Sequence, residues 1–194
     1  QKTGLYLDQL DAHREIAKLA KGKRVLDCFC NQGGFALACA KAGAASVTAV
    51  DSSGPAIEAT LRNAELNGVE INAVKHNAFD YLKHCEDQYD IVILDPPSFT
   101  KNKKSLNNAM RGYKEIHLRG IKLLDRDGVL ATYCCSHHAS RQMFLDNIVT
   151  ASVDAKRTLR LVASHGQRLD HPVIPAIPET EYLKGFVLEL MPSR

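Results

Sequence analysis

Short apolar runs alternate with longer amphipathic stretches along most of this sequence, and this alternation is what most constrains the fold. Runs rich in valine, isoleucine and leucine are typical of buried strands, whereas apolar residues at every third or fourth position are typical of a helix packed on a sheet. Regular alternation of the two predicts βαβ units, and hence a mainly parallel sheet with helices on both faces. The expected strands are 24–29, 46–50, 71–75, 90–94, 128–134, 159–163 and 184–190, and the expected helices are 10–21, 35–42, 55–66, 77–85, 106–124 and 140–153.

The final two runs, 159–163 and 184–190, have no helical stretch between them. Parallel neighbours need a long crossover, usually a helix, so these two strands are expected to pair antiparallel at one edge of the sheet. The proline-containing segment 165–182 between them is expected to be a loop. The fold class is therefore α/β, with a seven-stranded and mostly parallel sheet.

The composition is that of an ordinary single-domain soluble protein. The 194 residues are 45% hydrophobic and 24% charged, and the formal net charge is +3. That charge is too small to require a nucleic-acid partner and too small to exclude one. No apolar run approaches the ~20 residues of a membrane-spanning helix. Six cysteines in an α/β pattern favour reduced thiols and a cytoplasmic location.

One strand ends in a way that suggests a site. The run Asp90–Leu94 is followed by Asp95, Pro96 and Pro97. Neither proline can donate a backbone hydrogen bond, and Pro96 biases Asp95 towards an extended backbone, so the strand stops there and presents an acid. Ligands of open α/β sheets bind at this edge, beyond the carboxyl ends of the strands. Taken alone, the stretch is equally consistent with a strand and a stiff turn.

The turn after the first strand helps to decide between ligand classes. It lacks the G-x-G-x-x-G pattern of a dinucleotide site and holds only Gly33-Gly34, which would let a ligand approach the backbone closely. Asp51 ends the second strand, where a carboxylate can accept hydrogen bonds from both hydroxyls of a ribose. Asn77 starts a helix, so its side chain can either cap that helix or contact the edge of an adenine.

Together these motifs resemble the class I S-adenosylmethionine-dependent methyltransferases. The matching pieces are residues 25–35 (Val-Leu-Asp-Cys-Phe-Cys-Asn-Gln-Gly-Gly-Phe), Val50-Asp51, Asn77-Ala78 and Asp95-Pro96-Pro97. The family commonly has a third glycine before the pair, and this chain has Cys28–Cys30 there instead. The resemblance implies S-adenosyl-L-methionine as cofactor, with its methionine part on the first-strand loop, its ribose on Asp51, its adenine on Asn77 and its methyl group beside Asp95. The implied cofactor-binding residues are Asp27, Cys28, Phe29, Asn31, Gly33, Gly34, Asp51, Ser52, Asn77, Ala78, Asp95 and Pro96.

Further segments narrow the resemblance to the ribosomal large-subunit RNA cytosine-C5 methyltransferases. They are residues 2–9 (Lys-Thr-Gly-Leu-Tyr-Leu-Asp-Gln), 133–136 (Tyr-Cys-Cys-Ser), 170–174 (Asp-His-Pro-Val-Ile) and 182–186 (Tyr-Leu-Lys-Gly-Phe). The resemblance covers the whole chain and implies a Rossmann-like sheet of strand order 3-2-1-4-5-7-6, with the last strand antiparallel. In that family an RNA-binding domain of PUA type precedes the catalytic domain. This chain resembles the catalytic domain alone, with 1–22 as a cover segment and helix and 23–194 as the core.

Methylation at C5 of cytosine needs a nucleophile, because that carbon does not accept a methyl group unaided. A thiolate that adds to C6 makes C5 enamine-like and leaves after the C5 proton is lost. Cys135 follows the fifth strand, and the match to the family's Cys-Ser pair selects it over Cys134, which is expected in the core. With strands four and five adjacent, Cys135 is expected about 5 Å to the side of Asp95, the acid that would engage the base. His137 or His138 could favour the thiolate.

Several residues are expected to contact the RNA substrate. Lysines and arginines at 101, 103, 104, 111 and 114 follow the acid-Pro-Pro turn, where they could bind phosphates or form a solvated face. Phe99 could stack on a flipped base or pack under the loop. The resemblance implies that the segment around Tyr6 folds over the active site. The expected substrate-binding residues are Tyr6, Asp8, Gln9, Pro97, Phe99, Lys101, Arg111 and Lys184.

Other interpretations stay open at this point. The cysteines at 28–30 and 134–135 with two following histidines could suggest zinc, but their spacing is not that of C-x₂₋₄-C pairs and no metal is expected. A methyltransferase of different chemistry, such as guanine N7 methylation, would need no nucleophile. A catalytically silent RNA-binding assembly factor on the same fold would bind no cofactor. The expected partner is ribosomal RNA, with no membrane contact, and the chain could form a homodimer.

Overall fold

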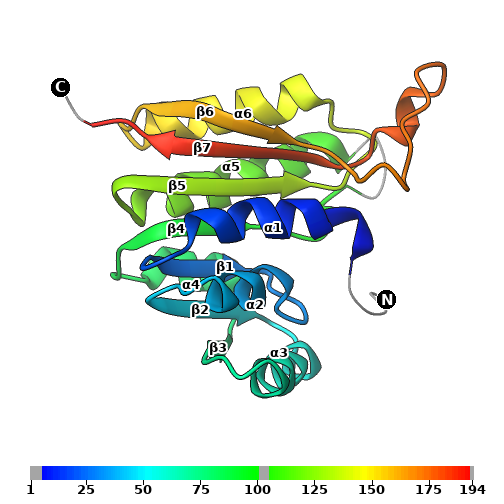
Figure 1. Ribbon diagram of the computed structural model, residues 1–194. Helices are drawn as coiled ribbons and strands as arrows, with labels where there is room; N and C mark the ends of the chain where they lie inside the picture. The colour runs from blue at the N-terminus through cyan, green and yellow to red at the C-terminus, as the bar shows by residue number, and fades with distance from the viewer. Residues whose placement is uncertain (1–5, 101–104, 193–194) are drawn as a thin grey trace.

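The computed structural model describes residues 6–100 and 105–192 of the chain. Its centre is one seven-stranded sheet with helices on both faces (Figure 1). The strands are β1 (Arg24–Cys28), β2 (Ser46–Asp51), β3 (Asn72–Lys75), β4 (Tyr89–Leu94), β5 (Leu124–Cys134), β6 (Leu159–His165) and β7 (Lys184–Leu190). The helices are α1 (Leu10–Leu19), α2 (Gly34–Lys41), α3 (Gly54–Leu66), α4 (Ala78–His84), α5 (Leu106–Lys122) and α6 (Arg141–Asp154), with the 3₁₀ helices η1 (Leu7–Gln9) and η3 (Pro178–Thr180).

The strand order is β3-β2-β1-β4-β5-β7-β6, which confirms the predicted fold. β1 pairs in parallel with β2 and with β4, and β4 pairs in parallel with β5. β7 lies between β5 and β6 and is antiparallel to both. Because the parallel strands end at the same edge of the sheet, the residues that follow β1, β2, β4 and β5 are brought together there.

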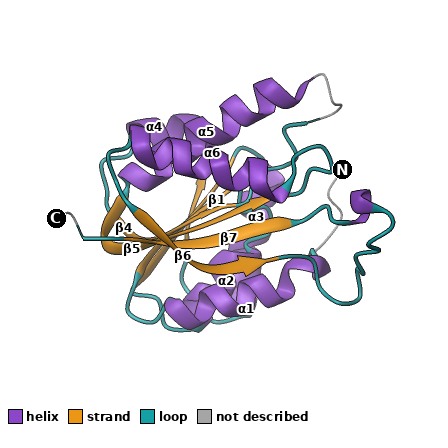
Figure 2. Ribbon diagram, turned by 90° about the horizontal axis from the view of Figure 1, so that it is seen from above, coloured by secondary structure: helices purple, strands orange, loops and turns teal. Residues whose placement is uncertain are grey.

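Two apolar layers hold the helices on the sheet. Neighbouring residues of β1 face opposite layers: Val25 packs with Ile16 of α1 and Phe35 of α2, whereas Leu26 packs in the layer that contains Ile116 of α5. Figure 2 shows α1 and α2 on one side of the sheet and α4, α5 and α6 on the other. In the part of the chain that the structure describes, no helix is long and apolar enough to cross a membrane.

The fifth strand begins earlier than its sequence pattern predicts. The Asp-Gly turn at 127–128 was expected to precede the strand, but β5 already starts at Leu124, which pairs with Tyr89. The register then shifts, because Ile91 pairs with Val129 and the residues between form a bulge on β5. The expected start of the strand was therefore wrong: Asp127 has a positive φ of 58°, but residues 127–128 lie within β5. The pairing that extends the strand depends on β4, which local sequence patterns do not reveal.

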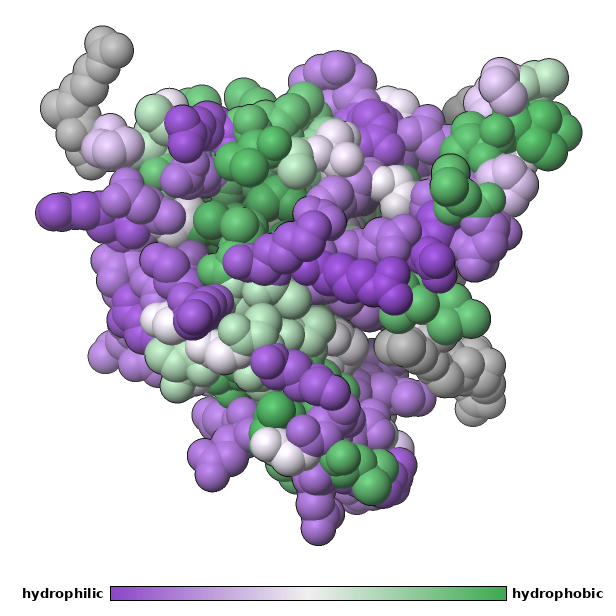
Figure 3. Space-filling model, viewed as in Figure 1, coloured by the Kyte–Doolittle hydropathy of each residue, from purple (hydrophilic) through white to green (hydrophobic). Residues whose placement is uncertain are grey.

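The segment 166–182 between the antiparallel strands projects beyond the sheet (Figure 1). It carries apolar residues that are exposed at its tip, visible as a green area at the upper right of Figure 3. Thr180 folds the tip back on itself, because its hydroxyl accepts a hydrogen bond from Ile174 N (2.8 Å) and donates one to Ile177 O (2.7 Å). The exposed apolar residues are Leu169, Val173, Ile174 and Ile177.

Candidate active site

The loop after β1 has a strained backbone. Phe29, Asn31 and Gly33 have positive φ angles of 64°, 50° and 82°. A left-handed backbone costs an ordinary side chain roughly 1–2 kcal/mol, and such residues gather at functional sites. Cys30 N donates to Val50 O (3.1 Å), which ties the loop to β2. Phe29 thus adopts with a side chain a backbone conformation that glycine would adopt without strain.

The glycine pair at the start of α2 leaves no room for side chains. A Cβ atom at Gly33 would lie 2.9 Å from Cγ2 of Thr60, and one at Gly34 would lie 2.7 Å from Cε1 of His13. Both distances are shorter than real Cβ contacts. Gly33-Gly34 therefore allows α2 to begin close to α1 and α3, in addition to leaving the backbone accessible to a ligand.

Asp27 is a buried acid with one unsatisfied oxygen. Its Oδ2 accepts a hydrogen bond from Ala36 N (3.0 Å) in the first turn of α2. Its Oδ1 has no hydrogen-bond partner among the described residues. Burial, and to a lesser extent the nearby carboxylates of Asp95 and Asp51, raise the pKa of Asp27 to about 8. A buried acid with an open oxygen is suited to an ammonium group, which would favour its charged form.

A pocket lies over this loop and brings predicted and unpredicted residues together. Six of its lining residues were expected from the sequence: Tyr6, Asp27, Phe29, Asn31, Gly34 and Asp95. Of the other four, Cys30 and Gln32 lie in the first-strand loop that was expected to hold the methionine part, Phe35 follows that loop, and His13 was not expected. Of these, His13 is the titratable side chain that faces the pocket from α1, and burial lowers its pKa to about 4. No motif marks it, because a histidine on the apolar face of a helix resembles a core residue.

Asp51 connects the ends of β1 and β2. Its Oδ2 accepts a hydrogen bond from Asn31 N (3.0 Å), and its Oδ1 accepts one from Ser53 N (2.9 Å). Each carboxylate oxygen keeps a second lone pair, so the half-buried side chain can still accept hydrogen bonds from a ligand. Ser52, the next residue, is exposed. The structure therefore shows that Asp51 helps to shape the loop after β1, in addition to the ribose-binding role that was predicted for it.

Asn77 caps α4, as one of its two sequence interpretations predicted. Its Oδ1 accepts hydrogen bonds from Phe79 N (2.9 Å) and Asp80 N (3.3 Å). Ala78, the first residue of the helix, is buried. The side-chain oxygen of Asn77 is thus used within the protein, and its amide nitrogen is the group that could reach an adenine.

Asp95 is contacted by the N-terminal segment. Nε2 of Gln9, in η1, donates a hydrogen bond to Oδ1 of Asp95 (3.1 Å). Gln9 is only 4% exposed, and the backbone N–H of Asp95 donates to Cys28 O (3.4 Å). The acid at the end of β4 is therefore held between η1 and the end of β1.

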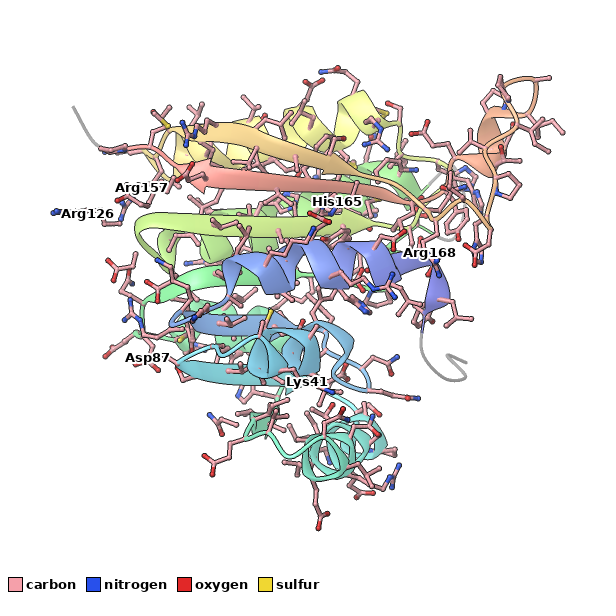
Figure 4. All side chains as sticks on the ribbon, in the orientation of Figure 1. Lys41, Asp87, Arg126, Arg157, His165 and Arg168 are labelled. Atoms are coloured by element: carbon pink, nitrogen blue, oxygen red, sulfur yellow. The ribbon has the colours of Figure 1, made fainter. Side chains whose placement is uncertain are left out.

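The projecting segment 166–182 holds the N-terminal segment from the other side. Asp8 Oδ2 accepts a hydrogen bond from the hydroxyl of Tyr182 (2.7 Å), and Asp8 O accepts one from Arg168 N (3.2 Å). Arg168 also pairs with Asp11 of α1 (3.2 Å) and lies beside the start of that helix (Figure 4). Residues separated by more than 150 positions thus form one cover at the edge of the pocket.

Cys135 follows β5 directly and is half-buried, whereas Cys134 is fully buried, as expected. The register corrects one expectation. Leu94 of β4 pairs with Thr132 of β5. Asp95 is one residue beyond this pair on its strand, whereas Cys135 is three residues beyond it. The thiol is therefore displaced along the strand direction by about two residues, roughly 7 Å, rather than directly beside the acid.

The turn after Cys135 is held from several sides. The hydroxyl of Ser136 hydrogen-bonds the hydroxyl of Thr100 and accepts a hydrogen bond from His138 N (3.2 Å). Lys184, expected to contact RNA, is only 2% exposed, and its Nζ donates to Ser136 O and to Glu181 O (3.3 Å). Lys184 in this structure therefore contacts backbone carbonyls.

The two prolines and Phe99 after Asp95 differ in their exposure. Pro96 is buried and Pro97 is exposed. The ring of Phe99 packs against Tyr113 and Phe79, with centroid distances of 4.7 and 5.7 Å. Of its two sequence interpretations, packing under the loop is the one that the structure displays.

The basic residues after this turn are only partly described. Arg111 is exposed on α5, and Lys114 forms an ion pair with Asp154 (2.7 Å). The lysines at 101, 103 and 104 lie outside the described residues. Among described residues, no cluster of three or more His, Cys, Asp or Glu side chains could hold a metal ion.

Known proteins resemble this chain in sequence. A family model described as S-adenosylmethionine-dependent methyltransferase matches residues 1–184. Ribosomal RNA large subunit methyltransferase I of Shewanella denitrificans is 42% identical over 192 residues, and that of Aeromonas hydrophila is 42% identical over 193 residues. These matches cover 96% of this chain but 48% and 49% of the relatives, so the chain spans about half of their length.

The fold also matches a solved structure. The crystal structure of SMU.776 complexed with SAH superposes with a TM-score of 0.87 at 27% identity. The match covers 97% of this chain and 51% of that chain. Sequence and fold thus point to the same group of proteins.

Proposed function

Because the chain belongs to the S-adenosylmethionine-dependent methyltransferases, we propose that it forms 5-methylcytosine in large-subunit ribosomal RNA with Cys135 as nucleophile. One observation carries the proposal: Asp95, an acid that lines the pocket, and Cys135, a half-buried thiol, follow two adjacent parallel strands. The substrate class is supported by the relatives, which bear the name of a ribosomal RNA large subunit methyltransferase.

S-adenosyl-L-methionine is the cofactor of this family and supplies an electrophilic methyl group bound to sulfur. The residues present fit its polar parts. The open Oδ1 of buried Asp27 can accept a hydrogen bond from an ammonium group. Asp51 retains lone pairs for ribose hydroxyls, and Asn77 can donate from its amide nitrogen to adenine.

The chain's own part in the chemistry falls to two side chains. The thiolate of Cys135 adds to C6 of cytosine, which places electron density on C5. Asp95 engages the base, either as a protonated acid that donates to N3 and so stabilises the negative charge developing in the ring, or as a carboxylate that accepts from the exocyclic amine and orients the base. Once C5 carries the methyl group, a base such as water takes the C5 proton, the C5–H electron pair restores the C5–C6 double bond, and the C6–S bond breaks to release the Cys135 thiolate. The offset between Asp95 and Cys135 supports this division, because a flat base needs room between the acid and the nucleophile.

RNA binding is proposed for the surface around the acid. Exposed Pro97 and Arg111 lie on the segments that follow β4, and Lys101 belongs to the same stretch of sequence. Phosphate contacts there would position the RNA without reading its sequence. Tyr6, Asp8 and Gln9 would close over the flipped base, which the contact between Gln9 and Asp95 supports.

Cys135→Ala tests the proposal. In cells that lack the natural gene, the unchanged chain within its full-length protein is expected to restore a protected cytosine in bisulfite sequencing of ribosomal RNA, whereas the Cys135→Ala form is not. Cys85→Ser is the matched control, because Cys85 is also a half-buried thiol but follows α4 at a distance from β5. Protection that survives Cys135→Ala would rule out the covalent mechanism, and an unchanged cytosine pattern without the gene would rule out the substrate.

A further inference from the structure

Lys184 is a buried cation at the first position of β7. It is 2% exposed, although lysine is almost never buried unless it is paired. Its Nζ donates hydrogen bonds to two neutral groups, Ser136 O and Glu181 O. The carboxylate of Glu181 binds Arg141 instead (3.0 Å), and no carboxylate of the described residues forms an ion pair with Lys184. The buried positive charge therefore has no carboxylate in ion-pair contact within this part of the chain, although the Glu181 carboxylate and the Arg141 guanidinium both act on it electrostatically.

Such an arrangement is costly unless something compensates it. Hydrogen bonds to carbonyl oxygens satisfy the donors of an ammonium group but do not neutralise its charge. Burial lowers the pKa of Lys184 in consequence. The buried ammonium group of Lys184 thus favours any anion that can form beside it. Binding of RNA phosphate at the surface does not explain why this side chain has no access to solvent.

The thiol of Cys135 is placed to become that anion. Lys184 pairs with Cys134 across β5 and β7, and one of its two acceptors is the carbonyl of Ser136. Cys135 lies between these two contacted residues. Electrostatic interaction with Cys134 acts most strongly on Lys184, followed by that with Glu181 and Arg141, and Cys135 acts on it as well. Cys135 is half-buried and Cys134 fully buried, so Cys135 is the thiol that substrate can reach.

Other titratable groups face the same thiol. Tyr6, Tyr113 and Tyr182 interact with Cys135 electrostatically, and burial is the largest cause that raises the pKa of each phenol. All three phenols are therefore neutral near pH 7, whereas Lys184 acts on the thiol as a cation. His137, which the sequence offered as an activating group, is exposed, with its Nδ1 bound to Glu179 O (2.8 Å).

We propose that Lys184 is a positioning residue for the nucleophile: its buried ammonium group fixes the Cys135-Ser136 turn through the Ser136 carbonyl and supplies the positive charge that favours the Cys135 thiolate. The inference rests on the proposed role of Cys135. It replaces the expected contact of Lys184 with RNA by an action of Lys184 on the Cys135 thiol. It also gives a reason for a buried lysine that forms no ion pair with a carboxylate of the described residues.

The test measures the thiol directly, without cofactor or RNA. In the Cys85→Ser form of the full chain, Cys135 is the one cysteine that is not buried, so iodoacetamide reacts with it selectively. Its alkylation rate rises with the thiolate fraction, and the midpoint of the pH profile is expected below the ~8.5 of an ordinary thiol. Tandem mass spectrometry assigns the modified residue. A midpoint at or above 8.5 in the otherwise unchanged chain would overturn the inference.

Lys184→Met in the same background removes the charge and keeps most of the side-chain length. The midpoint is expected to rise by about one unit or more, as for loss of an opposite charge within 4–6 Å. Lys122→Met, at the exposed end of α5, is the control and should leave the midpoint unchanged. If circular dichroism shows that the Lys184→Met chain folds and its midpoint is unshifted, the inference is contradicted. If this variant does not fold, the pH profile of the chain with Lys184 decides by itself whether the inference holds. Since neither measurement requires methylation, failure here is separate from failure of the proposed function.

Discussion

Gln9 donates a hydrogen bond from its Nε2 to Oδ1 of Asp95 over 3.1 Å, and so joins η1 to the acid at the end of β4. The two residues are 86 positions apart, and the Oε1 atom of Gln9 is buried without a hydrogen-bond partner in the described part of the chain. An unsatisfied acceptor beside the candidate site is suited to the exocyclic amine of an incoming base. This arrangement supports the proposal that Gln9 contacts the incoming base.

Gln9→Ala is expected to lower the rate of methyl transfer by about tenfold or more. A hydrogen bond to a charged group contributes about 1.5–3 kcal/mol, and 1.4 kcal/mol corresponds to a factor of ten. Single-turnover kinetics with the full-length protein and its RNA measure the effect. Gln9→Glu keeps the size but places a carboxylate against Asp95, so it should lose more activity than Gln9→Ala. Full activity of the alanine form would mean that Gln9 only packs.

Tyr182→Phe is expected to loosen the cover without unfolding the sheet. The change removes the hydrogen bond from the Tyr182 hydroxyl to Asp8 Oδ2, which contributes about 1.5–3 kcal/mol to a charged acceptor. Hydrogen exchange at residues 6–9 should become faster, while the amides of β1 and β4 keep their protection. Unchanged exchange at 6–9 would show that the other contacts of Asp8 suffice.

The left-handed loop can be tested by glycine substitution. Asn31→Gly removes a side chain at φ 50° and keeps the backbone N–H that Asp51 binds, so the free energy of unfolding should change by less than about 1 kcal/mol. Phe29→Gly relieves similar strain but deletes a ring that lies 6.2 Å from Phe79, and should destabilise by about 2 kcal/mol. Urea denaturation compares the two, and equal effects would contradict this account.

Asp27 is expected to make stability depend on pH. Its folded pKa of about 8 lies above the ~3.9 of an exposed aspartate, so between these values the folded chain holds a proton that the unfolded chain has released. The free energy of unfolding should therefore fall as pH rises from about 4 to about 8. Asp27→Asn still accepts the hydrogen bond of Ala36 and cannot ionise, so its stability should fall less over this window. Urea denaturation at pH 5 and pH 8 measures both slopes, and equal slopes would exclude burial of the proton by Asp27.

Much of the fold followed from local patterns in the sequence. The strand runs and helical stretches are set by side-chain periodicity, which is why β1, β4 and β7 begin and end within one residue of their predicted positions. Asp51 and Asp95 could be named because a parallel sheet brings strand ends to one edge. These inferences need only neighbours in sequence and one general rule of topology.

The remainder depends on contacts between distant segments. From sequence alone, a lysine in a strand is expected to be a cation at the surface. Only the pairing of β5 with β7 shows that Lys184 is buried, with its Nζ bound to the Ser136 carbonyl. The offset of Cys135 from Asp95 comes from the register of β4 and β5, which sequence patterns do not give to within two residues. His13 reaches the pocket only because α1 packs closely on Gly34.

The most direct test of the central claim uses RNA that carries 5-fluorocytosine at the target position. Fluorine cannot leave C5 as a proton does, so a thiol adduct at C6 persists after methylation. With S-adenosyl-L-methionine and the full-length protein, the account predicts a stable protein–RNA complex whose attachment maps to Cys135 by tandem mass spectrometry. An adduct at another residue, or methylated 5-fluorocytosine released without any adduct, would contradict it.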